Sequence, residues 1–168
     1  CLMAWAERDP SRREDRIRRA NFAFGLGEAS WNEDLVLQRY ELLYEAGVVS
    51  ESGCAAETNP GRAMFADHRR ILATGIARLR AKIKYRPVVF ELMPPVFTLL
   101  QLQRTVEALS GVRLHKQNFR RLVEHQGLVE ESGGISATTG GRPARLVRFR
   151  REVLLERPAP GLRLRPGR

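Results

Sequence analysis

Residues 98–127, TLLQLQRTVEALSGVRLHKQNFRRLVEHQG, predict two helices separated by only four residues. Thr98 and Gln101 have the spacing of a capping box, in which two side chains satisfy free backbone amides at a helix start. Apolar residues at helical spacing then form one face, and Gly111 is typical of a helix end. That face consists of Leu99, Leu102, Val106 and Leu109. This part of the sequence therefore indicates a helix-turn-helix.

The second of these helices is expected from about His115 to Gln126 and presents polar side chains outward. If Phe119, Leu122 and Val123 face the core, the residues left on the outside are of the types that read DNA bases. Arg and Lys donate to guanine, and Asn and Gln pair with adenine. The candidate base-contacting or phosphate-contacting residues of this helix are Lys116, Gln117, Asn118, Arg120 and Arg121.

The elements around this pair predict a winged helix. A helix is expected over residues 66–84 and a short strand over Val88–Leu92 on the N-terminal side. On the C-terminal side, a strand begins at Leu128, residues 132–143 form a Gly-rich hairpin tip, and residues 144–149 return as a second strand. A helix-turn-helix followed by a β-hairpin is the order of a winged-helix domain.

The hairpin, or wing, adds a second set of candidate DNA contacts. Its glycines permit close approach of the backbone to phosphate, and its arginines supply positive charge. The candidate residues of the wing are Thr139, Arg142 and Arg145, with Arg148 further along the strand.

The chain divides into three predicted parts, and the fold class is mainly α with a small β component. Residues 1–62 are expected to form a helical segment and linker, with a capping box from Ser30 to Glu33. Residues 63–156 are expected to form the winged helix-turn-helix domain. Residues 157–168 are expected to be a disordered basic tail, because they offer little material for a core.

The charge of the chain lies mainly in its second half. The 168 residues hold 29 Lys and Arg against 19 Asp and Glu, a net charge of +10, of which residues 85–168 carry +8. A polyanion partner is therefore expected at the winged helix.

No apolar run approaches about 18 residues, so no membrane-spanning helix is expected. Cys1 and Cys54 cannot form a disulfide framework, which favours a reduced, cytoplasmic setting.

Sites of catalysis or metal binding are not expected in this chain. The three histidines, His68, His115 and His125, are scattered, and no nucleotide-binding or nucleophile motif is present. Glu41 and Glu45 lie four residues apart and could share a divalent metal, but exposed carboxylates beside an apolar stripe are the favoured interpretation. No catalytic residue, metal ligand or cofactor is therefore assigned.

Several runs of the sequence, in order, resemble the Nudix-related transcriptional regulators of NAD metabolism. They cover about residues 64–150 and are more specific together than any one motif alone. They are Asp67–Ala73, Leu79–Pro87, Phe90–Pro94, Phe97–Leu99, Leu102–Gln103, Asn118–Arg121 and Gly140–Ala144.

The resemblance implies a Nudix-like sensor domain joined to a winged helix that binds operator DNA as a homodimer. It also implies an ADP-ribose-like nucleotide as effector, whose binding releases DNA in the better-known members. The carboxylate box with which Nudix hydrolases hold magnesium is not matched, because Tyr40 and Tyr44 stand where the box needs Arg and Glu. The chain is accordingly expected to be a fragment in which most of the sensor is missing.

Three hypotheses on function follow from these observations. The first is a sequence-specific, double-stranded DNA-binding transcriptional regulator. The second is a Nudix hydrolase of nucleoside-diphosphate-linked substrates, whose Mg²⁺-binding box lies upstream and whose winged helix only assists. The third is a helical module whose basic face binds an acidic protein. The first is favoured because a basic helix, a basic hairpin and the excess charge occur in the same half of the chain.

Overall fold

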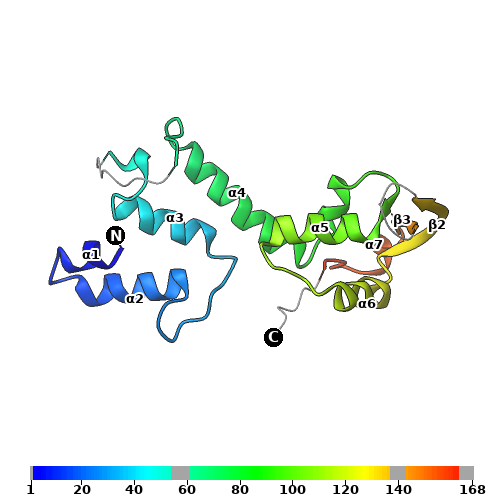
Figure 1. Ribbon diagram of the computed structural model, residues 1–168, viewed down its shortest axis with the longest axis horizontal. Coiled ribbons are helices and arrows are strands. Elements are labelled where there is room, and N and C mark those ends of the chain that lie inside the picture. The colour runs from blue at the N-terminus through cyan, green and yellow to red at the C-terminus, as the bar shows by residue number, and fades with distance from the viewer. Residues whose placement is uncertain (1, 54–60, 137–142, 163–168) are drawn as a thin grey trace. The chain divides into compact units, whose positions relative to one another are not determined.

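The computed structural model describes residues 2–53, 61–136 and 143–162, which fold into two compact units (Figure 1). The first unit is Cys1–Arg78 and the second is Leu79–Arg168, so the boundary falls inside helix α4 (His68–Ile83). The sequence had predicted a boundary at residue 62. The difference arises because α4 serves both units: Ala73 is buried in a core of the first, and Ile83 is buried in the core of the second.

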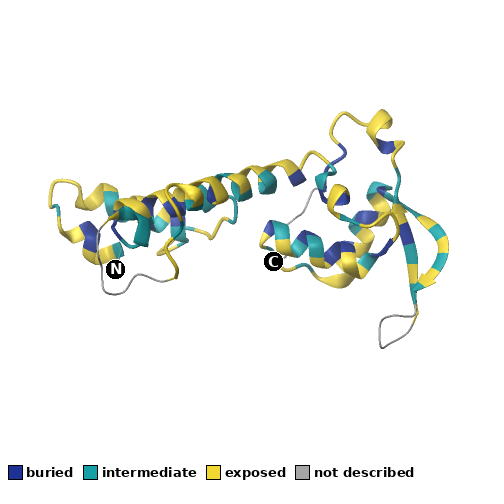
Figure 2. Cartoon of the chain, turned by 90° about the horizontal axis from the view of Figure 1, so that it is seen from above, coloured by how far each residue is buried: buried dark blue, intermediate teal, exposed yellow. Residues whose placement is uncertain are grey.

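The first unit is helical, as expected. It contains α1 (Leu2–Glu7), α2 (Arg13–Phe24), α3 (Val36–Glu45) and the 3-10 turn η1 (Ser50–Ser52), besides the first part of α4. Two small groups of buried side chains hold it together, one around Trp5 and Leu42 and the other around Tyr40. Figure 2 shows buried positions of the chain interspersed with intermediate and exposed ones along its helices.

The predicted capping box at Ser30 is wrong, because α3 begins six residues later without a side-chain cap. The intervening loop is held instead by Arg39, which is buried and donates hydrogen bonds to the carbonyls of Ala23 (2.9 Å) and Asn32 (2.8 Å). The Trp31 ring lies on the same guanidinium, 4.1 Å from it. A side chain from the first turn of α3 thus binds the preceding loop and the end of α2.

The second unit has the predicted order of a winged helix. After α4 come the 3-10 helix η2 (Val88–Leu92), β1 (Phe97–Thr98), α5 (Leu99–Ser110), α6 (Lys116–Gln126), β2 (Val129–Ser136), β3 (Ala144–Phe149) and the short α7 (Val153–Glu156). The three strands form an antiparallel sheet in the order β1-β3-β2. The largest side chains that are fully buried in its core include Phe97, Leu102 and Leu128. The mainly α fold class with a small β component is confirmed.

The strand predicted for Val88–Leu92 is wrong, since this segment is the 3-10 helix η2. Val89 and Phe90 are buried in the core all the same, and the Phe90 amide donates to the Pro87 carbonyl at 3.0 Å. The strand on this side of the sheet is β1, only two residues long, which pairs with Leu146 and Val147 of β3. A short apolar run does not distinguish a buried strand from a buried turn of helix.

Helix α5 begins and ends as the sequence predicts. The Thr98 hydroxyl accepts a hydrogen bond from the Gln101 amide at 3.2 Å, and the Gln101 side chain accepts one from the Thr98 amide at 2.7 Å. Gly111, with φ of 76°, ends the helix in the left-handed conformation. Such a φ favours glycine, and here the Arg80 guanidinium also lies where a Cβ would be.

A small network of hydrogen bonds fixes the turn between α5 and α6. The Leu114 amide donates to Oε1 of Glu107 at 2.8 Å, and Nε2 of Gln103 donates to the Leu114 carbonyl at 2.8 Å and to the same Glu107 oxygen at 3.2 Å. Both the amide and the carbonyl of Leu114 are thus hydrogen-bonded to side chains of α5. This network, here called the turn clamp, sets the direction in which α6 begins.

The described part of the predicted basic tail is ordered against the core, contrary to the expectation from the sequence. Leu162 is fully buried, and its amide donates to the carbonyl of Ile83 at 2.9 Å. Arg157 donates to the carbonyl of Gln126 at 2.7 Å. Residues 157–162, here called the strap, therefore run from the end of α6 to the end of α4. A single buried leucine, Leu162, is enough to anchor this segment of prolines and glycine to the core.

The turn clamp makes folding stability depend on pH through Glu107. The Leu114 amide and then the Gln103 side chain hold the pKa of Glu107 below its ordinary value of 4.5. A carboxyl whose pKa is lowered by folding stabilises the folded state above that ordinary value and loses this contribution as the pH falls through the lowered one. Glu107→Gln should therefore be less stable than the wild type at pH 7, and the difference should shrink as the pH falls below the ordinary carboxyl pKa of 4.5.

Urea denaturation followed by circular dichroism at several pH values would measure this. Glu91→Gln, at an exposed carboxylate of η2 with no hydrogen bond among the described residues, is the matched control. A constant gap between wild type and Glu107→Gln from pH 7 to about pH 3 would show that the turn clamp does not carry the charge dependence.

Candidate nucleic-acid interface

Helix α6 presents a continuous polar face to solvent. Phe119 and Val123 are buried beneath it, and Leu122 is half-buried. All five residues that the sequence singles out on this helix are exposed: Lys116, Gln117, Asn118, Arg120 and Arg121. None of their side chains makes a hydrogen bond or ion pair within the described residues. Their charges and donors are therefore free to meet an external partner.

The C-terminal end of α6 is held by two arginines that flank α7. Nε of Arg150 donates to the carbonyl of Gly127 at 2.9 Å, and Arg157 donates to that of Gln126. Positive charge at a helix C-terminus also interacts favourably with the helix dipole. Arg150 is itself held by both carboxylate oxygens of Glu156, at 2.7 Å each, and this pairing raises the pKa of Arg150 and lowers that of Glu156. Sequence analysis missed these roles, because the partners are distant in the chain.

The hairpin of β2 and β3 stands beside the helix-turn-helix, but its described arginines are already paired. Glu130 and Arg148 lie opposite each other in the register and form an ion pair at 2.6 Å. Arg145 pairs with Glu131 at 2.5 Å. The positive charge that the sequence assigns to these strands is therefore largely neutralised locally. Thr139 and Arg142, the other two candidates of the wing, lie outside the described residues.

A β-bulge bends the hairpin between Glu131 and Ile135. Ser132, Gly133 and Gly134 on β2 face the single residue Leu146 on β3, whose side chain lies against Gly134. Gly133 has φ of 78°, which a glycine adopts without strain. The predicted Gly-rich tip thus begins later than expected, because β2 continues through this bulge to Ser136.

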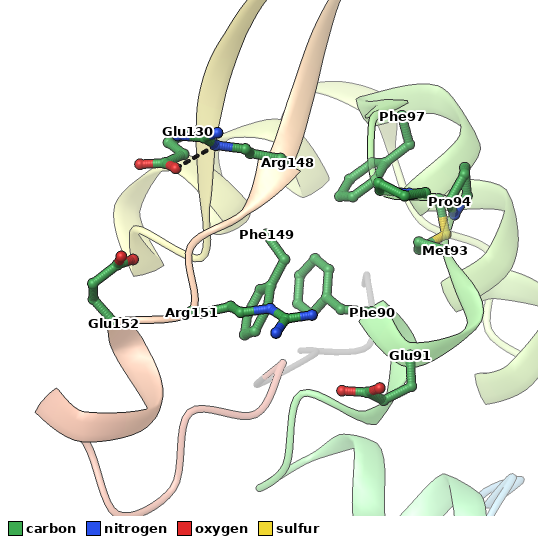
Figure 3. Close-up of a pocket in the computed structure, with 11 residues that line it drawn as sticks. Phe90, Glu91, Met93, Pro94, Phe97, Glu130, Arg148, Phe149, Arg151 and Glu152 are labelled. Atoms are coloured by element: carbon green, nitrogen blue, oxygen red, sulfur yellow. Dashed lines mark hydrogen bonds and ion pairs between the residues drawn. The ribbon is translucent and has the colours of Figure 1, made fainter.

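A pocket of about 520 Å³ lies at the base of the hairpin (Figure 3). The rings of Phe90 and Phe149 stack there with their centroids 4.3 Å apart, so that η2 supports the end of β3. Glu91, Arg151 and Glu152 reach its rim, and α6 contributes no residue to it. The pocket therefore belongs to the packing that positions the hairpin, and it is separate from the polar face of α6.

Metal-binding and membrane-spanning features are absent from the part of the chain that the structure describes. No group of three His, Cys, Asp or Glu side chains there is suited to a metal ion. Glu41 and Glu45, considered as a metal pair, instead form ion pairs with Arg70 at 2.9 Å and Arg19 at 2.5 Å. None of the described helices combines the length and apolarity needed to cross a bilayer.

Comparison with known proteins relates the second unit to one family. Residues 89–149 match the protein family described as "NrtR DNA-binding winged helix domain". The ADPR responsive transcriptional repressor NtrR of Acinetobacter baylyi is 43% identical over 83 residues, which are 49% of this chain and 33% of that protein. The matched part thus spans a third of the length of this curated relative.

Two crystal structures of Shewanella oneidensis NrtR are also similar. The one in complex with a 27mer DNA is 31% identical, with a TM-score of 0.47, and the similarity covers 54% of this chain and 41% of that one. The second structure gives a TM-score of 0.46 at the same identity and coverage.

The matched segment contains the turn clamp, the polar face of α6 and the β2–β3 hairpin. The order of elements agrees with the resemblance seen in the ordered motifs, and residues 89–149 are similar in sequence to the NrtR DNA-binding winged helix domain.

Proposed function

We propose that this chain binds double-stranded DNA through its second unit, as the DNA-binding part of a transcriptional regulator. The observation that carries the proposal is the exposed, unpaired polar face of α6 on a helix whose two ends are fixed by hydrogen bonds. The second helix of a helix-turn-helix enters the major groove with its N-terminal residues at the base edges. Lys116, Gln117 and Asn118 occupy that position in α6.

The roles of the side chains follow from their chemistry. Gln117 and Asn118 have the paired donor and acceptor that match adenine, and Arg120 and Arg121 have the fork that matches guanine or a phosphate. Lys116 supplies a point charge for the backbone. Arg145 must exchange Glu131 for a phosphate before it contributes, so the hairpin should add less affinity than its charge count suggests. The proposed mechanism is non-catalytic and needs no metal or cofactor.

Titration with duplex DNA tests the base-reading role of α6. Gln117→Ala or Arg120→Ala should weaken binding to a selected operator by about 1–3 kcal/mol and relax the preference at individual base pairs. Both residues are exposed, so the melting temperature should not change. Arg145→Ala should lower the logarithmic salt slope by less than the 0.9 or so of a full phosphate contact, because Glu131 already pairs with this arginine.

The operator would be obtained by selection from random duplexes, with affinity then followed by fluorescence anisotropy over a range of salt. Arg151→Ala serves as the matched control, since Arg151 is exposed and lines the pocket at the base of the hairpin, to which α6 contributes no residue. The proposal fails if the wild-type chain forms no complex with duplex DNA at low salt.

We also propose that the protein acts as a homodimer on a palindromic operator. A single α6 reaches only one half-site, and helix-turn-helix proteins read two half-sites through their two-fold symmetry. Sedimentation of the chain with operator DNA should give two copies of the 19.1 kDa chain per duplex. A complex with one chain on a duplex that holds both half-sites would contradict the dimer.

We propose an ADP-ribose-like nucleotide as the effector, acting through a Nudix-like sensor in the full-length protein. The support is the name of the Acinetobacter relative, which is described as ADPR responsive, together with the resemblance of the sequence motifs. Addition of ADP-ribose to the complex of the full-length protein with operator DNA should raise the dissociation constant, whereas AMP should not. Equal binding with and without ADP-ribose would exclude this effector.

A DNA-binding regulator acts in the compartment that contains the DNA, which agrees with the proposed cytoplasmic location.

A further inference from the structure

A groove of about 810 Å³ lies between α6 and the strap. Asn118, Arg121 and His125 line it from the helix, and Arg157, Ala159 and Gly161 line it from the strap. Figure 1 shows the strap as the last described segment, beside α6. Two of the residues proposed to contact DNA, Asn118 and Arg121, therefore belong to this groove as well as to the polar face. The groove opens directly from the proposed DNA-binding surface.

The charge of the groove is positive. Arg121 and Arg157 line it, His125 adds a ring N–H, and no carboxylate occurs among its described lining residues. The nearby Glu156 is held by Arg150 through both of its oxygens. Arg157 is exposed and spends only one of its five donors on the Gln126 carbonyl. The charge of the groove is thus suited to an anion such as phosphate rather than to a cation.

The strap is held in place at both ends, so the groove exists before any ligand binds. Arg157 ties its start to α6, and buried Leu162 ties its end to Ile83. Gly161 lies so close to the backbone of Lys84 and Tyr85 that a Cβ at this position would overlap them. Pro158 and Pro160 further restrict the backbone between these anchors. A preformed site loses little conformational entropy on binding.

The position of the groove on α6 selects its occupant. At 100° per residue, Asn118 and Leu122 lie on one flank of α6, whereas Lys116 and Arg120 lie on the opposite flank. A helix in the major groove has one sugar-phosphate backbone along each flank. A free anion would need only one arginine, but the groove continues along the helix for about two turns, from Asn118 to His125.

We propose that the strap is a second phosphate-contacting element of the winged helix, and that the groove receives the DNA backbone on the flank of α6 opposite Lys116 and Arg120. Arg157 and Arg121 contact phosphates of this strand from its two sides. The inference rests on the proposed DNA binding and adds the strap to the interface. It also gives the strap a phosphate-contacting role for which the described arginines of the hairpin, Arg145 and Arg148, are already paired with carboxylates.

A pair of variants at Ala159 tests the proposal without disturbing the anchors of the strap. Ala159 is exposed and lines the groove, so Ala159→Glu and Ala159→Gln add side chains of equal size that differ only in charge. Ala159→Glu should weaken binding to duplex DNA at low salt by about tenfold or more, because like charges are brought together. Ala159→Gln should remain near the wild type, and Ala4→Glu on exposed α1 controls for net charge.

Arg157 provides the second measurement. Arg157→Gln should lower the logarithmic salt slope by about 0.9, the value of one lost phosphate contact. Arg157→Lys keeps a charge and a donor and should restore most of the affinity. Thermal unfolding of each variant separates lost DNA contact from lost capping of α6. Equal losses in Arg157→Gln and Arg157→Lys would contradict a phosphate contact, even if Ala159→Glu proved unstable.

The outcomes distinguish this inference from the proposed function. If both Ala159 variants bind like the wild type while Gln117→Ala weakens binding, DNA binding stands and the role of the strap is wrong. If the wild-type chain itself binds no duplex DNA at low salt, both are wrong. Loss of binding in Ala159→Glu alone, with an unchanged melting temperature, is the result that supports the strap.

Discussion

The orientation of α6 depends on hydrogen bonds at its two ends, which add to the burial of Phe119 and Val123 in the core. At the N-terminal end, Gln103 and Glu107 of α5 satisfy the backbone of Leu114, and at the C-terminal end Arg150 and Arg157 satisfy the last carbonyls. Backbone groups that the chain leaves unpaired at helix ends are thus used to join the helix to its neighbours. Because the side chains on the outer face take no part in this, they can vary or bind a partner without any loss of support for the helix.

Electrostatics divides the surface of the second unit into paired and unpaired regions. On the hairpin, Glu130 and Glu131 pair with Arg148 and Arg145, whereas the basic side chains of α6 have no acidic partner within the described residues. Exposed ion pairs contribute little to stability, but they lower the local field. The positive field of the unit should consequently be strongest around α6 and the strap. This distribution is not visible in the net charge of the sequence, which counts every arginine equally.

Sequence patterns predicted the features that depend on neighbouring residues and missed those that depend on distant ones. The capping box of Thr98 and Gln101 and the glycine that ends α5 are local and were confirmed. The predicted start of α3 was wrong: Arg39 of α3 binds the preceding loop and the Ala23 carbonyl, which lies sixteen residues earlier in the chain. The polar face of α6 was predicted because an amphipathic helix reveals its exposed side. The strap was missed because one buried residue, Leu162, gives no periodic signal.

Ile83, the last residue of α4, connects this helix to the strap. The same residue is the last of a helix that starts in the first unit, a member of the core of the second, and the acceptor for the Leu162 amide. The strap leads from there to the final carbonyls of α6. A rotation or axial shift of α4 would therefore be transmitted to α6 through the strap and its two hydrogen bonds. Coupling of this kind requires no direct contact between α4 and α6.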